Sequence, residues 1–199
     1  MKHLLAVAVL ASLVLFISCA GPSPSTPEAQ QYEVVGSEEQ TPDNGRSARH
    51  WLIVSDCSTF EERAHTLARA ALDLHREHGL DLTQVTLYPT EALVGSGFRL
   101  AHGFYAADGR AGQGLSGADP EYRATWSVLA TRDTIGPVDV RVAELWESLW
   151  SEYPSSDPLS SSLVDDAALR ERIAQELDLD VGQVHPPHFR LERWIEIAE

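Results

Sequence analysis

Residues 48–88 read ARHWLIVSDCSTFEERAHTLARAALDLHREHGLDLTQVTLY and contain the clearest structural pattern in the chain. The apolar run Trp51–Val54 within 48–55 is typical of a strand covered on both faces. Thr59 with Glu62 predicts a capping box at a helix start, and Gly79 predicts the helix end. Between them the apolar residues have helical spacing: Phe60, Ala64, Leu67, Ala71 and Leu74. With a short strand at 85–88, the segment predicts a strand-helix-strand unit with parallel strands and a right-handed crossover.

The flanking segments extend this unit into a sheet. Residues 32–35 read as a strand, and the Asn44-Gly45 pair predicts a turn before residue 48. Residues 98–107 and 122–131 predict an antiparallel hairpin, because the second run alternates apolar and polar positions. Residues 138–150 have helical spacing after Gly136-Pro137. We expect an α+β fold, a two-layer sandwich with a mixed, mostly antiparallel sheet of about five strands and two helices on one face.

The remaining sequence divides the chain into four regions. We assign 1–18 to a signal peptide, 19–31 to a Pro/Ser-rich tether, 32–152 to the α+β domain and 153–199 to an acidic C-terminal appendage. In the appendage, 165–177 predicts an amphipathic helix with Leu169, Ile173 and Leu177 inward, and 189–197 resembles a strand. We expect this helical appendage either to pack on the sheet edge or to present a surface to a partner.

The N-terminus indicates export. Lys2 and His3 precede an apolar run that only Ser12 interrupts, and the run is too short for a permanent membrane span. The stretch 16–19, FISC, resembles the lipobox of bacterial lipoproteins, although Phe16 stands where leucine is usual. The resemblance implies lipid attachment at Cys19 and a chain that lies on the membrane without crossing it. The alternative is an ordinary signal peptide in which Cys19 is incidental. In a Gram-negative host, Ala20 would favour the outer membrane, facing the periplasm.

The charge balance excludes several classes of function. Lys2 is the only lysine, so the chain from Cys19 onward has fourteen arginines against thirty acidic residues, a net charge of −16. Such a chain repels phosphate backbones, and we expect no nucleic-acid partner. Because the chain from Cys19 onward contains no lysine, it cannot form a Schiff base through a lysine and cannot have the lysine of a phosphate-binding loop. The expected partners are the membrane, through the N-terminal lipid, and an envelope protein contacting the acidic C-terminal segment.

The segment TFEERA at 59–64, together with Thr66, resembles a family of small bacterial α+β domains of unknown function. The resemblance covers roughly residues 32–150. It supports the fold class and implies no activity. Helix-cap chemistry alone could also produce so short a motif.

Cys57 is the candidate catalytic residue, because it lies at the entrance to the capped helix, where the helix dipole favours a thiolate. His65 or His102 could act as its base if the fold brought one of them close. The alternative interpretation is a buried, structural cysteine. We predict no cofactor and no metal site, since histidine pairs occur without a third ligand at a diagnostic distance.

The loop 107–121 contains the pattern G-x-G-x-x-G from Gly112 to Gly117. It lies inside a predicted hairpin and not between a strand and a helix, so we reject a dinucleotide site. Tyr105, Gly112, Gly114 and Trp126 remain candidates for lining a ligand groove, with core packing as the default for the aromatic residues.

These observations favour a membrane-anchored bacterial lipoprotein whose exported domain binds or scaffolds something in the cell envelope without catalysis. The alternative is a cell-envelope enzyme that uses Cys57 at the helix N-terminus.

Overall fold

The computed structural model describes residues 28–41, 45–111, 125–155, 164–185 and 189–194. The described residues form a six-stranded mixed sheet in the order β1-β2-β3-β4-β5-β6, which is also the order of the strands in the chain. Only β2 and β3 are parallel, and every other neighbouring pair is antiparallel. The strands are β1 Glu33–Gln40, β2 Ala48–Val54, β3 Leu82–Tyr88, β4 Ala101–Tyr105, β5 Trp126–Thr131 and β6 Leu191–Arg193. The predicted α+β class is confirmed.

The predicted strand-helix-strand unit is present with the predicted caps. Helix α1 spans Phe60–His78 and connects the parallel strands β2 and β3. The Thr59 side chain accepts a hydrogen bond from the Glu62 backbone N–H at 3.1 Å, and the Glu62 carboxylate accepts one from the Thr59 backbone N–H at 3.1 Å. Gly79 ends the helix in the left-handed region at φ 63°, which glycine adopts without steric cost.

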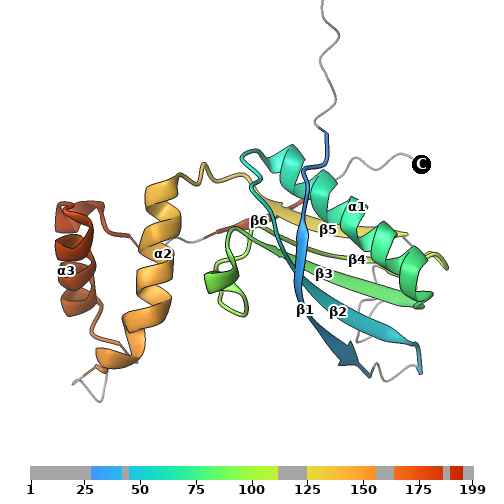
Figure 1. Cartoon of the computed structure of the whole chain (residues 1–199), viewed down its shortest axis with the longest axis horizontal. Coiled ribbons are helices and arrows are strands. Elements are labelled where there is room, and N and C mark those ends of the chain that lie inside the picture. Colours follow the sequence, from blue (N-terminus) through green and yellow to red (C-terminus); the bar gives the residue numbers. More distant parts are fainter. Residues whose placement is uncertain (1–27, 42–44, 112–124, 156–163, 186–188, 195–199) are drawn as a thin grey trace, which may run out of the picture.

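Helix α1 covers one face of the sheet, where it packs on β3, β4 and β5 (Figure 1). Its five predicted inward residues are all buried, together with sheet residues that include Trp51, Ile53, Val85, Leu87, Val128 and Ala130. Gly103 of β4 permits this close contact. A Cβ added there would lie 2.5 Å from the Ser127 carbonyl oxygen and 2.9 Å from Leu67 Cδ2.

The second long helix does not lie on the sheet beside α1, as the sequence led us to expect. Helix α2, Pro137–Leu149, stands beyond the end of the sheet and packs against α3, Asp166–Leu177 (Figure 1). Leu145 of α2 shares a separate core with Leu169 and Ile173 of α3, both fully buried. The apolar stripe of α2 therefore meets another helix, a choice that its periodicity alone does not specify.

Three short helical turns complete the described elements. They are η1, Glu91–Leu93, η3, Trp150–Glu152, and η4, Val181–Gln183. η1 contacts α2, and Leu93 is buried with Tyr88 and Ala143 where α2 meets the sheet. The sheet has six strands and not about five, because residues 191–193 pair with β5. No helix among the described residues is long and apolar enough to cross a membrane.

Candidate functional site

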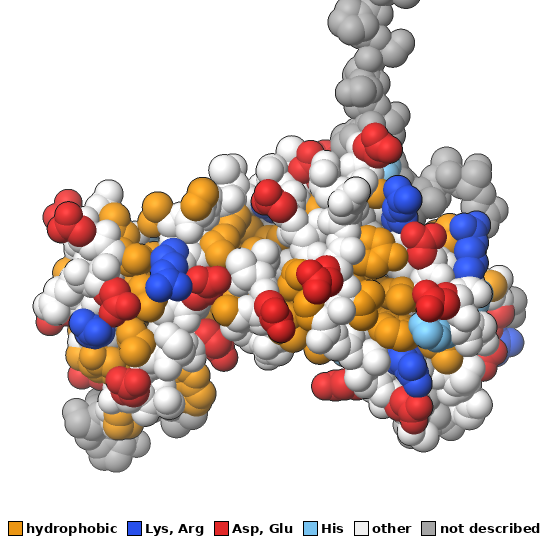
Figure 2. All heavy atoms as spheres, in the orientation of Figure 1, with side chains coloured by type: hydrophobic (Ala, Val, Ile, Leu, Met, Phe, Trp, Pro, Cys, Tyr) orange, Lys and Arg blue, Asp and Glu red, His pale blue; other side chains and the backbone are white. Residues whose placement is uncertain are grey.

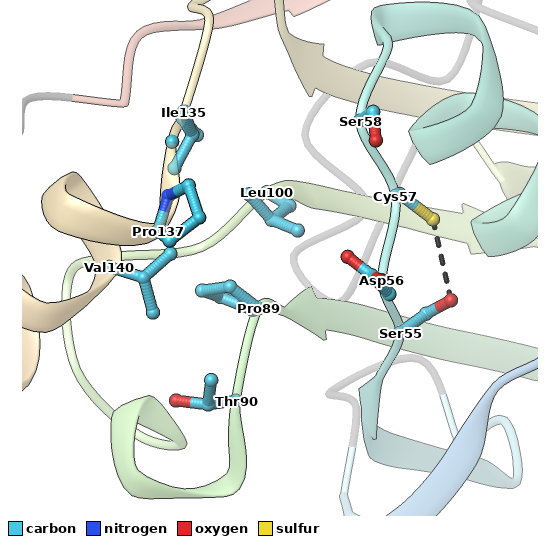
Figure 3. Close-up of a pocket in the computed structure, with 11 residues that line it drawn as sticks. Ser55, Asp56, Cys57, Ser58, Pro89, Thr90, Leu100, Ile135, Pro137 and Val140 are labelled. Atoms are coloured by element: carbon cyan, nitrogen blue, oxygen red, sulfur yellow. Dashed lines mark hydrogen bonds between the residues drawn. The ribbon is translucent and has the colours of Figure 1, made fainter.

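A cleft of about 400 Å³ opens where β2 and β3 end and where α1 and α2 begin (Figure 3). The carboxyl ends of parallel strands are the usual place for ligands in open α/β sheets, and the volume falls in the range of about 300–1,000 Å³ that is typical of small-molecule sites. The loop after β2, the end of β3, the approach to β4 and the start of α2 supply its lining: Ser55, Asp56, Cys57, Ser58, Pro89, Thr90, Leu100, Ile135, Gly136, Pro137 and Val140.

The two walls of the cleft differ in chemistry. The loop 55–58 contributes hydroxyls and the Asp56 carboxylate, which points toward the cavity in Figure 3. The opposite wall is apolar and comes from Ile135, Pro137 and Val140, with Leu100 and Pro89 between the two walls. Pro137 is at the first turn of α2, where its fixed φ and missing N–H fit the helix start.

Backbone N–H groups at both helix starts already have carboxylate partners. Glu62 Oε2 accepts from the Ser58 N–H at 2.8 Å and from the Thr59 N–H at 3.1 Å. Asp139 Oδ2 accepts from the Gly136 N–H at 2.7 Å. The backbone hydrogen bonds from Thr59 and Ser58 hold the pKa of Glu62 below its usual value. These bonded groups leave the cleft less able to receive an anion.

The side chain of Arg63 connects the loop 55–58 to the end of β5 and to the residues that follow it. Its side chain is 1% exposed, and its guanidinium donates to four backbone carbonyls: Cys57 at 3.3 Å, Ser58 at 3.0 Å, Thr131 at 2.8 Å and Asp133 at 2.9 Å. Burial lowers the pKa of Arg63, and the carbonyl dipoles compensate for the lost hydration. Arg63 is a positioning residue whose donors face the protein interior.

A second polar cluster lies on the sheet face opposite α1 and was not predicted. Thr86 Oγ1 is 2.8 Å from His50 Nε2 and 2.9 Å from His102 Nδ1, so one hydroxyl joins two imidazoles on three neighbouring strands. Burial, with Arg99 and His50 adding to it, lowers the pKa of His102 to about 4. Beside them, Gln84 Oε1 is buried and has no hydrogen-bond partner among the described residues. Only the strand register brings these residues together.

The comparisons with known proteins place the chain in a family. A family model described as a domain of unknown function, DUF4875, matches residues 27–189. The chain belongs to the DUF4875 family. This agrees with the resemblance of residues 59–66 to a bacterial α+β family of unknown function. The matched region of this DUF4875 chain reaches beyond the predicted 32–150 and also includes α3.

A solved structure supports the fold of this DUF4875 domain. It is the crystal structure of a DUF487 family protein from Desulfovibrio piger, which is 21% identical to this chain and has a TM-score of 0.67. The similarity covers 85% of this chain and 97% of that chain. At this identity it shows the fold alone. The curated proteins gave no match.

Cys57 of the DUF4875 domain lines the cleft, yet its thiol points away from the cavity in Figure 3. The residue is 6% exposed, and Sγ lies 3.4 Å from the hydroxyl oxygens of both Ser55 and Thr66. Burial raises the pKa of the Cys57 thiol, which opposes formation of a thiolate. The two candidate bases have other neighbours: the ring of His65 packs on Trp194, and His102 belongs to the cluster around Thr86.

The predicted ligand groove is only partly within the described residues. Tyr105 and Trp126 are in contact, with ring centroids 4.4 Å apart, and His75 packs edge-on against Tyr105 at 4.7 Å. They are half-buried against the main core, which is the default we assigned to them. Gly112 and Gly114 lie outside the described residues, as does the predicted lipid attachment at Cys19. No group of three or more histidine, cysteine or acidic side chains in the described part could hold a metal ion.

Proposed function

We propose that this DUF4875 protein is a lipid-anchored component of the bacterial cell envelope whose exported domain binds a small molecule without catalysis. The observation that carries the binding function is the cleft of about 400 Å³ at the ends of the parallel strands. The lipobox-like stretch 16–19 supports the anchor. In a Gram-negative host, the proposed location is the outer membrane, facing the periplasm.

The attachment of the N-terminal segment to α1 relates the anchor to the cleft. The Gln30 N–H donates to Thr66 Oγ1 at 2.8 Å, and Gln30 Nε2 donates to Glu62 Oε1 at 3.3 Å. Glu62 belongs to the first turn of α1, which borders the cleft. Cys19 and Glu28 are nine positions apart, so the segment between them can span at most about 32 Å when fully extended. A lipid on Cys19 would therefore hold the cleft near the membrane surface.

The anchor is tested by expressing the wild type beside Cys19→Ala in a bacterial host and measuring intact mass and membrane fractionation. We expect a mature chain that begins at Cys19 with acyl additions and fractionates with membranes, and the loss of both properties in Cys19→Ala. Cys57→Ala is the matched control and should retain both. A soluble, unacylated wild-type product would contradict the anchor while leaving the cleft as a binding site of a secreted protein.

The second candidate is an envelope enzyme that uses Cys57, and its support is that Cys57 lines the cleft at the start of α1. Acylation of Cys19 would leave Cys57 as the only thiol. Because the thiol is buried and its pKa is raised, we expect iodoacetamide to modify it slowly in the folded protein and rapidly in denaturant. Rapid labelling of the folded protein, with an activity that Cys57→Ser abolishes, would favour the enzyme.

A protein partner for the acidic C-terminal segment remains a proposal of the same kind. Deleting residues 153–199 cannot test it cleanly, because β6 belongs to the sheet and Leu169 and Ile173 belong to the core of the helical pair. Substitutions that remove the charge of an exposed residue, such as Glu171→Gln, should leave the cores intact and are the better variants. Unchanged association of the variants with the envelope partner would contradict a role for this surface.

A further inference from the structure

We propose that the cleft selects a small organic cation, namely a primary ammonium group on a short apolar body. This inference rests on the proposed binding function and specifies its ligand class. The ammonium would bind the Asp56 carboxylate, and the apolar body would pack against Leu100 and Val140.

The charge inside the cleft is negative and uncompensated. Asp56 is the only charged residue among the described residues that line the cleft, and no hydrogen bond or ion pair joins it to another of them. The guanidinium of Arg63 is committed to four carbonyls in the interior. Arg141 of α2 is paired with Glu144 at 3.0 Å. These arginines therefore leave the Asp56 carboxylate available to a cationic ligand.

The hydrogen-bonding groups around the cleft favour donors over acceptors in the ligand. The backbone N–H groups of Ser58 and Gly136 are already bonded to carboxylates, so they do not offer an anion site. Thr90 donates its hydroxyl proton to Glu144 Oε1 at 2.9 Å, which leaves the Thr90 oxygen as an acceptor. An ammonium group has three donors and no acceptor, and it fits this set.

The apolar wall indicates that the part of the ligand beyond the ammonium group is apolar. Ile135, Pro137 and Val140 form this wall, and the apolar Pro89 and Leu100 lie beside it, so polar groups of a ligand would lose hydration there without gaining partners. Figure 3 shows this wall facing the Asp56 side of the cavity. A ligand that spans the cleft therefore needs a charged end and an apolar end. The acidic side chains scattered over the face in Figure 2 would also raise the local concentration of cations.

The test uses the purified full chain and n-butylammonium, with 1-butanol and butyrate as neutral and anionic probes of similar size. Binding is followed by NMR through the methyl resonances of Leu100 and Val140. We expect n-butylammonium to bind more tightly than both other probes. Asp56→Asn should weaken n-butylammonium about tenfold and leave 1-butanol unchanged, because it removes the charge and keeps the side-chain size. Asp178→Asn, at the exposed end of α3, removes the same charge and should have no effect.

The outcomes separate the ligand class from the binding function. If butyrate or 1-butanol binds in the cleft as tightly as n-butylammonium, or if Asp56→Asn leaves n-butylammonium binding unchanged, the cationic class is wrong while the binding function stands. If all three probes leave the Leu100 and Val140 resonances unchanged up to high millimolar concentration, both proposals are overturned. Equal weakening by Asp56→Asn and Asp178→Asn would indicate a nonspecific charge effect and would also overturn the proposed class.

Discussion

Arg63 is buried although its place in the sequence suggests an exposed side chain. It falls in the first turns of an amphipathic helix, where an arginine is expected to be exposed, yet it is buried and bonded to four carbonyls. Its long side chain connects the loop after β2 with the connection from β5 to α2. Both segments border the cleft, so the shape of the cleft depends on this one side chain.

Replacing Arg63 should therefore cost much more stability than replacing an exposed arginine of the same helix. We expect Arg63→Met to lower the free energy of unfolding by about 3 kcal/mol, because four carbonyls lose their donors. Arg69→Met is the control: Arg69 is exposed and 3.6 Å from Asp73, and a surface pair of this kind contributes about 0.5 kcal/mol or less. Urea denaturation measures both values. Similar losses in the two variants would contradict the bridging role of Arg63.

The lowered pKa of His102 predicts how the free energy of unfolding depends on pH. Its pKa in the folded protein is lowered from 6.5 to about 4, first by burial and then by Arg99 and His50, whereas the unfolded chain keeps the ordinary value. Between these values the unfolded state binds more protons, so the free energy of unfolding falls as the pH decreases from about 6.5 toward 4. The contribution of His102 is at most about 3 kcal/mol. The pKa of His50, which faces Glu38 across the strands, is lowered in the same direction by burial.

We expect His102→Asn to reduce the loss of stability between pH 7 and pH 5, as measured by urea denaturation at each pH. His185→Asn removes an exposed histidine and should follow the wild type. The NMR titration of the His102 ring gives a direct check, with a midpoint expected near pH 4. A midpoint near 6.5 would show that burial does not keep the His102 imidazole neutral in the folded protein.

At the scale of elements, the packing of α1 on the sheet depends on one missing side chain. Gly103 of β4 lies under α1, with Ser127 of β5 beside it. Because the Ser127 contact is to a backbone carbonyl, no side-chain rotation can make room for a Cβ. Strand β4 and helix α1 can approach this closely only with glycine at this position.

Gly103→Ala should lower the free energy of unfolding by about 2 kcal/mol through overpacking of α1 against β4 and β5. Gly97→Ala is the matched control, because a Cβ at Gly97 meets nothing within 4 Å and its φ is not positive. Thermal and urea unfolding, each followed by circular dichroism, measure both variants. Equal stability of the two alanine variants would contradict the close approach.

At the scale of the whole molecule, the described residues form two separate main cores. The first lies between α1 and the sheet, and the second lies between α2 and α3. A smaller cluster that includes Tyr88, Leu93 and Ala143 joins α2 to the sheet. The cleft lies at this junction, so its apolar wall depends on the helical pair.

Leu169→Ala tests the independence of the two cores. Leu169 is fully buried in the helical pair, and we expect a loss of about 3 kcal/mol that is confined to that unit. Hydrogen exchange should increase in α2 and α3 while β2 and β3 keep their protection. Uniform loss of protection across the chain would show a single cooperative unit instead.

Local patterns alone were enough to predict the strand-helix-strand unit. The capping box at Thr59, the buried positions of α1 and the glycine at its end depend on neighbours three or four residues away, and all are as predicted. The same holds for the inward residues Leu169 and Ile173 of α3. Such features are fixed by the geometry of the helix itself.

Other features depend on residues far apart in the chain, and periodicity carries no information about them. An apolar stripe indicates that α2 is covered on one side, yet a sheet face and a second helix bury it equally well, and α3 is what covers it. The register of β2, β3 and β4 joins His50, Thr86 and His102, which are up to 52 positions apart. Long-range packing likewise turns the Cys57 thiol inward and leaves the Asp56 carboxylate facing the cleft.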